Sequence, residues 1–118
     1  GEWLGTSEGR DRMLGFLLCV KPFQPQLSLE YRVKANNRPL EPWLPVDTYA
    51  GTFDRRRKLI GFGIRLMGAL ADQYDVHYQA LLQGEDEPAE GRNGSTCGTE
   101  NKRGDAIEGI RIWIEKRL

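Results

Sequence analysis

The chain of 118 residues has few of the residues that carry most enzyme and metal chemistry. It contains one histidine and two cysteines, with no Cys/His spacing typical of a zinc site. A Gly-x-Ser-x-Gly elbow and a phosphate-binding glycine loop are also missing from the sequence. The sequence therefore indicates a non-catalytic protein that uses no metal or other cofactor.

The chain also lacks an excess of charge of either sign. Lysine and arginine total 17, as do aspartate and glutamate, so the formal net charge is +0. Nucleic-acid-binding proteins usually have a clear basic excess, so nucleic acid is not an expected partner. The one basic cluster, residues 55–58, is interpreted as a solvated turn, or alternatively as a contact for a phosphate, a sulfated sugar or an acidic partner. No apolar run is long enough to span a membrane, so membrane insertion is not expected.

The acidic and imidazole groups form no visible catalytic constellation. Glu85, Asp86, Glu87 and Glu90 cluster in one predicted loop without apolar neighbours. A catalytic carboxylate pair needs two different environments, so this loop is interpreted as exposed and solvated. His77 lies on the polar face of a predicted strand and is interpreted as an exposed side chain.

What the sequence does contain is a unit that recurs three times. Gly-Thr pairs begin at positions 5, 51 and 98, which are 46 (51 − 5) and 47 (98 − 51) positions apart. Each pair leads through basic residues to an apolar segment. A fixed period of this size indicates one supersecondary unit used repeatedly. The units are a partial one, residues 1–26, and two nearly whole ones, residues 27–70 and 71–118, within a single domain covering 1–118.

Alternating apolar and polar side chains predict two strands in the whole units. Residues 27–35 and 74–82 alternate in this way, as half-buried strands do. A second kind of strand follows each Gly-Thr pair. Its core-facing residues are predicted to be Phe16, Leu18 and Val20; Phe62, Ile64 and Leu66; and Ile110, Ile112 and Ile114. The third copy needs a one-residue slip, which we expect a β-bulge to absorb.

Short strands at regular spacing and weak helix signals predict an all-β domain. Only residues 66–74 favour a single helical turn. Three copies favour a pseudo-threefold β-prism, with a β-trefoil or a β-sandwich as alternatives. Cys97 takes the place that Leu4 and Ala50 have in the other copies, so we expect a buried, inert thiol. A disulfide between Cys97 and Cys19 is an open alternative.

Two tryptophans are candidates for contact with a ligand or with the core. Trp43 is flanked by prolines in a stiffened loop, where a flat ring suits stacking on a sugar and equally suits capping one end of the core. Trp113 alternates with core residues and therefore lies on the opposite face. It is either packed under the N-terminal segment or exposed at an interface.

A series of short motifs resembles the jacalin-related lectins. In order, these are Ser28-Leu29-Glu30-Tyr31, Gly51-Thr52-Phe53, the basic turn 55–58, Leu59-Ile60-Gly61-Phe62, Gly68 to Asp72, and Tyr74-Asp75-Val76. The resemblance covers roughly residues 28–78. These lectins are β-prisms of three four-stranded Greek-key sheets, and they bind a monosaccharide at a Gly-x-x-x-Asp loop.

The resemblance implies a sugar site at Gly68, Ala69, Leu70, Ala71 and Asp72. The Asp72 carboxylate would accept charge-assisted hydrogen bonds from two sugar hydroxyls, and the amides of residues 69–71 would donate.

We therefore expect a non-catalytic carbohydrate-binding domain, with carbohydrate or a glycoconjugate as partner, Trp43 as an additional contact, and an extracellular or cell-surface location. One alternative is a structural or protein-interaction module of a surface or appendage protein, which stable homo-oligomers would favour. The other is an accessory module of a larger enzyme.

Overall fold

A computed structural model describes residues 4–5, 15–16, 26–36, 38–51, 58–98 and 106–118. Within these ranges the chain is all-β, as predicted. The one helical element of the described part is a 3₁₀ turn, η1 (Ala71–Gln73), which lies in the segment predicted to favour a helical turn. No helix in these ranges has the length and apolar character needed to cross a membrane.

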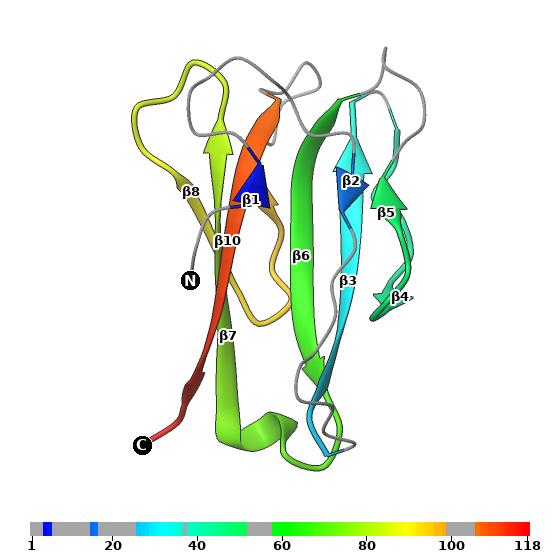
Figure 1. Cartoon of the computed structure of the whole chain (residues 1–118), viewed down its shortest axis with the longest axis vertical. Helices are drawn as coiled ribbons and strands as arrows, with labels where there is room; N and C mark the ends of the chain where they lie inside the picture. Colours follow the sequence, from blue (N-terminus) through cyan, green and yellow to red (C-terminus); the bar gives the residue numbers. More distant parts are fainter. Residues whose placement is uncertain (1–3, 6–14, 17–25, 37, 52–57, 99–105) are drawn as a thin grey trace.

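Ten strands lie in the described ranges and pair antiparallel in three sheets (Figure 1). The strands are β1 (Leu4–Gly5), β2 (Gly15–Phe16), β3 (Ser28–Ala35), β4 (Leu44–Pro45), β5 (Ala50–Gly51), β6 (Leu59–Met67), β7 (Tyr74–Leu82), β8 (Ala89–Arg92), β9 (Cys97–Gly98) and β10 (Ile107–Lys116). The β3–β6 sheet has the order β4-β3-β6-β9, the β7–β10 sheet has the order β1-β10-β7-β8, and β2 pairs with β5. Figure 1 shows the long strands β3, β6, β7 and β10 running along the longest axis, with η1 joining β6 and β7 at one end.

Both four-stranded sheets take their fourth strand from a distant part of the chain. Strand β9 joins β6, and β1 joins β10. One glycine pair recurs where such strands meet, and the β2–β5 pair contains it too. The three pairs are Gly61 with Gly98, Gly109 with Gly5, and Gly15 with Gly51. The three Gly-Thr starts of the sequence therefore occupy corresponding places in three strand pairings.

Glycine is required where these strands meet. Gly51 has a φ of 149° and Gly98 a φ of 143°, values that side-chain-bearing residues rarely adopt. A Cβ on Gly98 would lie 2.1 Å from the Ile60 carbonyl oxygen and 2.6 Å from the Gly61 Cα atom. The two backbones approach closely enough to pair only because no side chain stands between them.

The two four-stranded sheets repeat a tyrosine contact 47 residues apart. The Tyr31 hydroxyl donates a hydrogen bond to the Thr48 carbonyl oxygen, and the Tyr78 hydroxyl donates one to the Ser95 carbonyl oxygen. Burial raises the pKa of the Tyr78 phenol, which keeps it protonated as a donor. Each hydroxyl thus links the loop after β4 or β8 to an inner strand of its own sheet, β3 or β7 respectively.

The predicted slip in the third copy is not absorbed by a β-bulge peculiar to that copy. Both sheets have the same irregularity: Ile60 is the extra residue of β6, and Glu108 is the extra residue of β10. The additional residue of the third copy lies between β9 and β10, whose separation is one residue longer than that of β5 and β6. Most of that connection is outside the described residues.

The inward faces of all three sheets meet in one core. Alternate residues of β3 are buried, as predicted, and a chain of aromatic rings crosses the interior. Ring centroids lie 5.4 Å apart for Phe16 and Tyr31, 5.9 Å for Phe16 and Phe62, and 5.2 Å for Phe62 and Tyr78. Such contacts add roughly 0.5–1.5 kcal/mol each beyond the area that they bury.

The core-facing predictions hold for most of the described residues. Phe16, Phe62, Ile64 and Ile110 are buried, whereas Leu66 and Ile112 are partly buried. Ile114 is 40% exposed, because the last residues of strand β10 extend beyond the core. Leu18 and Val20 lie outside the described residues.

Cys97 is a fully buried thiol, as predicted. Burial raises its pKa to about 12, so the reactive thiolate form is suppressed. Cys19, its alternative disulfide partner, lies outside the described residues, as do residues 55–57 of the basic turn.

Replacing Gly98 by alanine tests the close strand approach. We expect Gly98→Ala to lower the free energy of unfolding by roughly 3 kcal/mol or more, since it adds a backbone clash to an unfavourable φ. Gly84→Ala is the matched control: Gly84 also has a positive φ, +83°, but a Cβ there meets nothing within 4 Å. That control should cost only about 1 kcal/mol. Equal losses for the two variants in urea unfolding would contradict this account of the strand junction.

Candidate functional site

The Gly68–Asp72 loop runs from the end of β6 into η1 and is hydrogen-bonded to the chain before β3. Gly68 has a φ of +104°, and a Cβ there would lie 2.4 Å from the Gln26 carbonyl oxygen. The Leu70 amide donates to the same oxygen at 2.8 Å, and the Ala71 amide donates to the Gly68 carbonyl oxygen at 3.1 Å. The loop is therefore held in one shape by its own backbone.

These hydrogen bonds limit what the loop can offer a sugar. A backbone N–H donates one strong hydrogen bond, so the amides of Leu70 and Ala71 are already used. Among the described residues, the Ala69 amide has no backbone acceptor, and the exposed Asp72 carboxylate has no hydrogen-bond or ion-pair partner. Of the groups that the resemblance assigns to the sugar, one amide and the Asp72 carboxylate therefore remain.

Trp43 lies on the outer face of the β3–β6 sheet and not at the end of the core. The core cluster does not include it. The guanidinium carbon of Arg32 is 4.4 Å from its ring centroid, and that of Arg65 is 4.3 Å away. Both are cation–π distances, and the Arg65 Nε atom also donates to the Glu30 carboxylate at 2.8 Å. The indole is therefore already engaged by charged groups of its own sheet.

An open pocket of about 410 Å³ lies on the outer face of the β7–β10 sheet. Its volume is within the range of small-molecule sites. The outward-facing side chains in its lining are His77 and Gln79 from β7, Glu90 and Arg92 from β8, and Trp113 from β10. Tyr78, Gly91 and Ser95 complete the lining. The pocket thus combines flat rings with several hydrogen-bonding groups.

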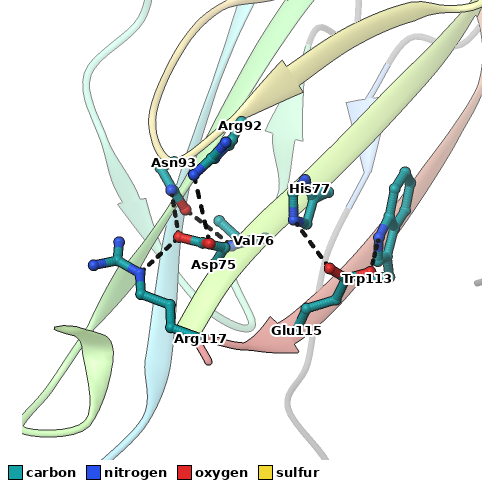
Figure 2. Close-up of polar contacts among 8 residues, drawn as sticks. All are labelled: Asp75, Val76, His77, Arg92, Asn93, Trp113, Glu115 and Arg117. Carbon is teal, nitrogen blue, oxygen red and sulfur yellow. Dashed lines mark hydrogen bonds and ion pairs between the residues drawn. The ribbon is translucent and has the colours of Figure 1, made fainter. Parts of the chain in front are cut away.

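The flat part of the pocket is a pair of stacked rings. His77 and Trp113 face each other across β7 and β10, with ring centroids 5.4 Å apart and an interplanar angle of 15°. Glu115 holds this pair: it accepts a hydrogen bond from the Trp113 Nε1 atom at 3.2 Å and lies 3.6 Å from the His77 Nε2 atom. Figure 2 shows these three side chains together on neighbouring strands. The Arg111 guanidinium also lies 5.0 Å from the Trp113 ring centroid, so charged side chains contact the ring pair from β10 itself.

The polar part of the pocket has both donors and acceptors. The Gln79 Nε2 atom donates to the Glu90 carboxylate at 3.0 Å, which leaves the other carboxylate oxygen and the amide carbonyl accessible. Ser95 accepts a hydrogen bond from the Arg92 amide at 2.8 Å and keeps its own hydroxyl proton. These groups lie beside the stacked rings, so one ligand can contact both.

A network around Asp75 lies on the same face of β7, two residues before His77 (Figure 2). The Asp75 carboxylate accepts hydrogen bonds from the Asn93 Nδ2 atom at 2.9 Å and the Arg117 Nε atom at 2.8 Å, and it lies 3.5 Å from the Arg92 guanidinium. The bond from Asn93, followed by the interaction with Arg117, lowers the pKa of Asp75. The Asp75 carboxylate thereby joins β7 to the end of β8, to the turn after β8 and to the residue that follows β10.

Alternation in the sequence predicts the outer face for His77 and Trp113, but it does not predict that their rings meet. His77 and Trp113 were predicted to lie opposite the core, and they do, but His77 is partly buried and not the exposed side chain that was predicted. The stacking of the two rings depends on the register of β7 against β10. Glu90 was assigned to an exposed acidic loop, whereas it lies on β8. Its strand is only four residues long and contains Gly91, which masks the alternating pattern.

Comparisons of the chain with models of known families, with curated proteins and with solved structures found no match. No group of three or more histidine, cysteine, aspartate or glutamate side chains in the described ranges is arranged to hold a metal ion. The assignment of a function therefore depends on the geometry of the outer faces and of the Gly68–Asp72 loop.

The lowered pKa of Asp75 predicts a pH-dependent contribution to stability. A carboxyl with a folded-state pKa below its ordinary value of 3.8 stabilises the fold above that value and loses the effect as the pH falls through the folded-state pKa. We expect Asp75→Ala to unfold at lower urea concentration than the wild type at pH 7, with the difference shrinking under acidic conditions. Asp86→Ala, in an exposed turn, is the control and should change little at either pH. A difference for Asp75→Ala that grows on acidification would contradict this.

Proposed function

We propose that this domain binds carbohydrate without transforming it. The observation that carries the proposal is the pocket on the β7–β10 sheet, where two stacked rings adjoin a carboxylate, an amide and a hydroxyl. A pyranose has one face rich in C–H bonds and an edge rich in hydroxyls. The C–H face packs on a flat aromatic surface, and the hydroxyls need donors and acceptors at the side.

The framework that we propose for this function is a pseudo-threefold, β-prism-like arrangement. It is supported by the recurring glycine pair and by the way each four-stranded sheet receives a strand from another unit. On such a framework the inward faces specify the fold, while the outer faces and connecting loops are free to differ. Function then belongs to the copy in which those positions suit a ligand.

The pocket is also pre-organised, which favours binding. The Trp113 indole is held by Glu115, Gln79 is held by Glu90, and Ser95 is held by the backbone of Arg92. A site whose side chains are already ordered loses less conformational entropy when the ligand binds. Weak individual contacts to a sugar can then add to a measurable affinity.

The Gly68–Asp72 loop is a second candidate place for the sugar, as the resemblance to jacalin-related lectins implies. It is favoured by the exposed Asp72 carboxylate, which has no partner in the described part of the chain, and by the rigid backbone around it. Its reduced set of donors makes it the poorer of the two sites.

Removing the Trp113 ring tests the pocket. On a glycan array we expect the wild type to bind one or more glycans and Trp113→Ala to bind them at least about tenfold more weakly, a loss of about 1.4 kcal/mol. Gln79→Ala gives a second, smaller truncation at the pocket edge, in case the tryptophan variant fails to fold. Glu87→Ala, on an exposed turn, is the control and should bind as the wild type does. An empty array for the wild type, accompanied by stable oligomers, would favour the protein-interaction alternative instead.

Asp72→Ala separates the two candidate sites. If the sugar binds in the pocket, this variant should retain wild-type affinity in a titration with the same glycan, because Asp72 does not line that pocket. A tenfold or greater loss, in a protein that still unfolds at the wild-type urea concentration, would move the sugar to the loop.

A further inference from the structure

The outer faces of the two four-stranded sheets can be compared residue by residue, because their strand registers agree. Tyr31 pairs with Leu44 in one sheet, and Tyr78 pairs with Gly91 in the other. Each partner lies 47 positions later in the second sheet (78 − 31 and 91 − 44). The same step relates Trp43 to Glu90 (90 − 43).

The two side chains that hold the Trp43 indole also have counterparts. Arg32 corresponds to Gln79 by the same 47-residue step. Arg65 corresponds to Trp113, because Arg65 lies opposite Glu30, and Trp113 lies opposite His77, the residue 47 positions after Glu30. Both counterparts line the open pocket.

A difference in side-chain size explains why one face is filled and the other is open. On the β3–β6 sheet, the Trp43 ring lies over the guanidinium groups of Arg32 and Arg65. The ring also reaches to 3.9 Å from the position that a Cβ atom would have on Gly94. On the β7–β10 sheet the corresponding residue is Glu90, which has no ring and turns toward Gln79. At the position that corresponds to Gly63, the β7–β10 sheet has Arg111, whose guanidinium lies over the Trp113 ring, 5.0 Å from its centroid. The pocket is the part of the indole's space that remains open beside these side chains.

We propose that the pocket is the unfilled copy of an internal ring site, and that a single neutral sugar ring binds there in the position that corresponds to the Trp43 indole. This inference rests on the proposed function and specifies its site. The ring lies between Trp113 and Gln79, the counterparts of the two side chains that hold the indole. Trp43 is then an internal occupant of its own sheet and not a ligand-binding residue.

The charges around the pocket are of both signs and favour a ring without net charge: Glu90 and Arg92 belong to the lining, and the Arg111 guanidinium lies 5.0 Å from the Trp113 ring centroid. The Glu90 carboxylate repels an anionic sugar and accepts hydrogen bonds from hydroxyls. Arg92 is the one cationic side chain of the lining, and it is already beside Asp75. A purely aromatic ring would cover the remaining acceptor oxygens of Gln79 and Glu90 without donating hydrogen bonds to them, so hydroxyls along the ring edge fit this site better.

The sharpest test puts an indole into the pocket from the protein's own chain. Glu90→Trp copies the arrangement of the β3–β6 sheet, so we expect a folded protein that binds the best glycan of the array at least tenfold more weakly. Gln79→Trp fills the same space from β7 and serves if Glu90→Trp does not fold. Trp43→Ala is the matched control, since it removes the internal ring and should leave the affinity unchanged. Titration calorimetry gives the affinities, and circular dichroism reports folding.

The outcomes separate this inference from the function on which it rests. A wild type that binds no glycan overturns both. A wild type that binds a glycan, with Glu90→Trp and Gln79→Trp folded and binding equally well, overturns only the pocket assignment and leaves carbohydrate binding in place. Loss of binding in Trp43→Ala would overturn the assignment of Trp43 as an internal occupant.

Discussion

The structure depends on a close approach between the backbones of strands that are distant in sequence. Strand β9 can pair with β6 only because Gly98 has no side chain where the Ile60 carbonyl oxygen lies. The same glycine pairing joins β1 to β10 and β2 to β5. Each junction connects strands from distant parts of the chain, so the inward faces of the sheets are brought against one another and can share a core. Without these junctions the sheets would expose the apolar faces that they now bury.

Once the inward faces are fixed in this way, the outward faces are free to diverge. In the β3–β6 sheet the cross-strand pair Glu30 and Arg65 is ionic, and the Trp43 indole lies against the Arg65 guanidinium. In the β7–β10 sheet the corresponding pair, His77 and Trp113, is aromatic and adjoins an open pocket. One register therefore supports a closed face and an open one. The two faces therefore differ through a few outward side chains and not through the fold.

The sequence predicts the buried half of this molecule far better than the exposed half. Alternation reports which face of a strand is buried, so the faces of Tyr31, Tyr78, His77 and Trp113 followed from the pattern. Alternation does not report which residue lies opposite which. The bulges at Ile60 and Glu108 shift each partner by one position, and a shift of one residue exchanges the two faces of a strand.

The short strand β8 was not predicted, for a different reason. Glycine is needed at position 91 because a Cβ there would lie 2.3 Å from the Tyr78 ring, and this glycine makes β8 look like a loop. Glu90 was therefore grouped with the acidic turn before it. Trp43 was predicted to contact either a sugar or the core. Its arginine contacts were not predicted, because Arg32 and Arg65 come from two strands whose pairing the sequence alone does not give.

The most direct test of the central claim is a titration followed by NMR on the tryptophan indole N–H signals. Trp113 lines the pocket, whereas Trp43 lies on the outer face of the other sheet, so the two rings report on two different faces of one molecule. Addition of the best-binding glycan should shift the Trp113 signal in a saturable way and leave the Trp43 signal unchanged. A saturable shift of Trp43 with Trp113 unaffected would contradict the account.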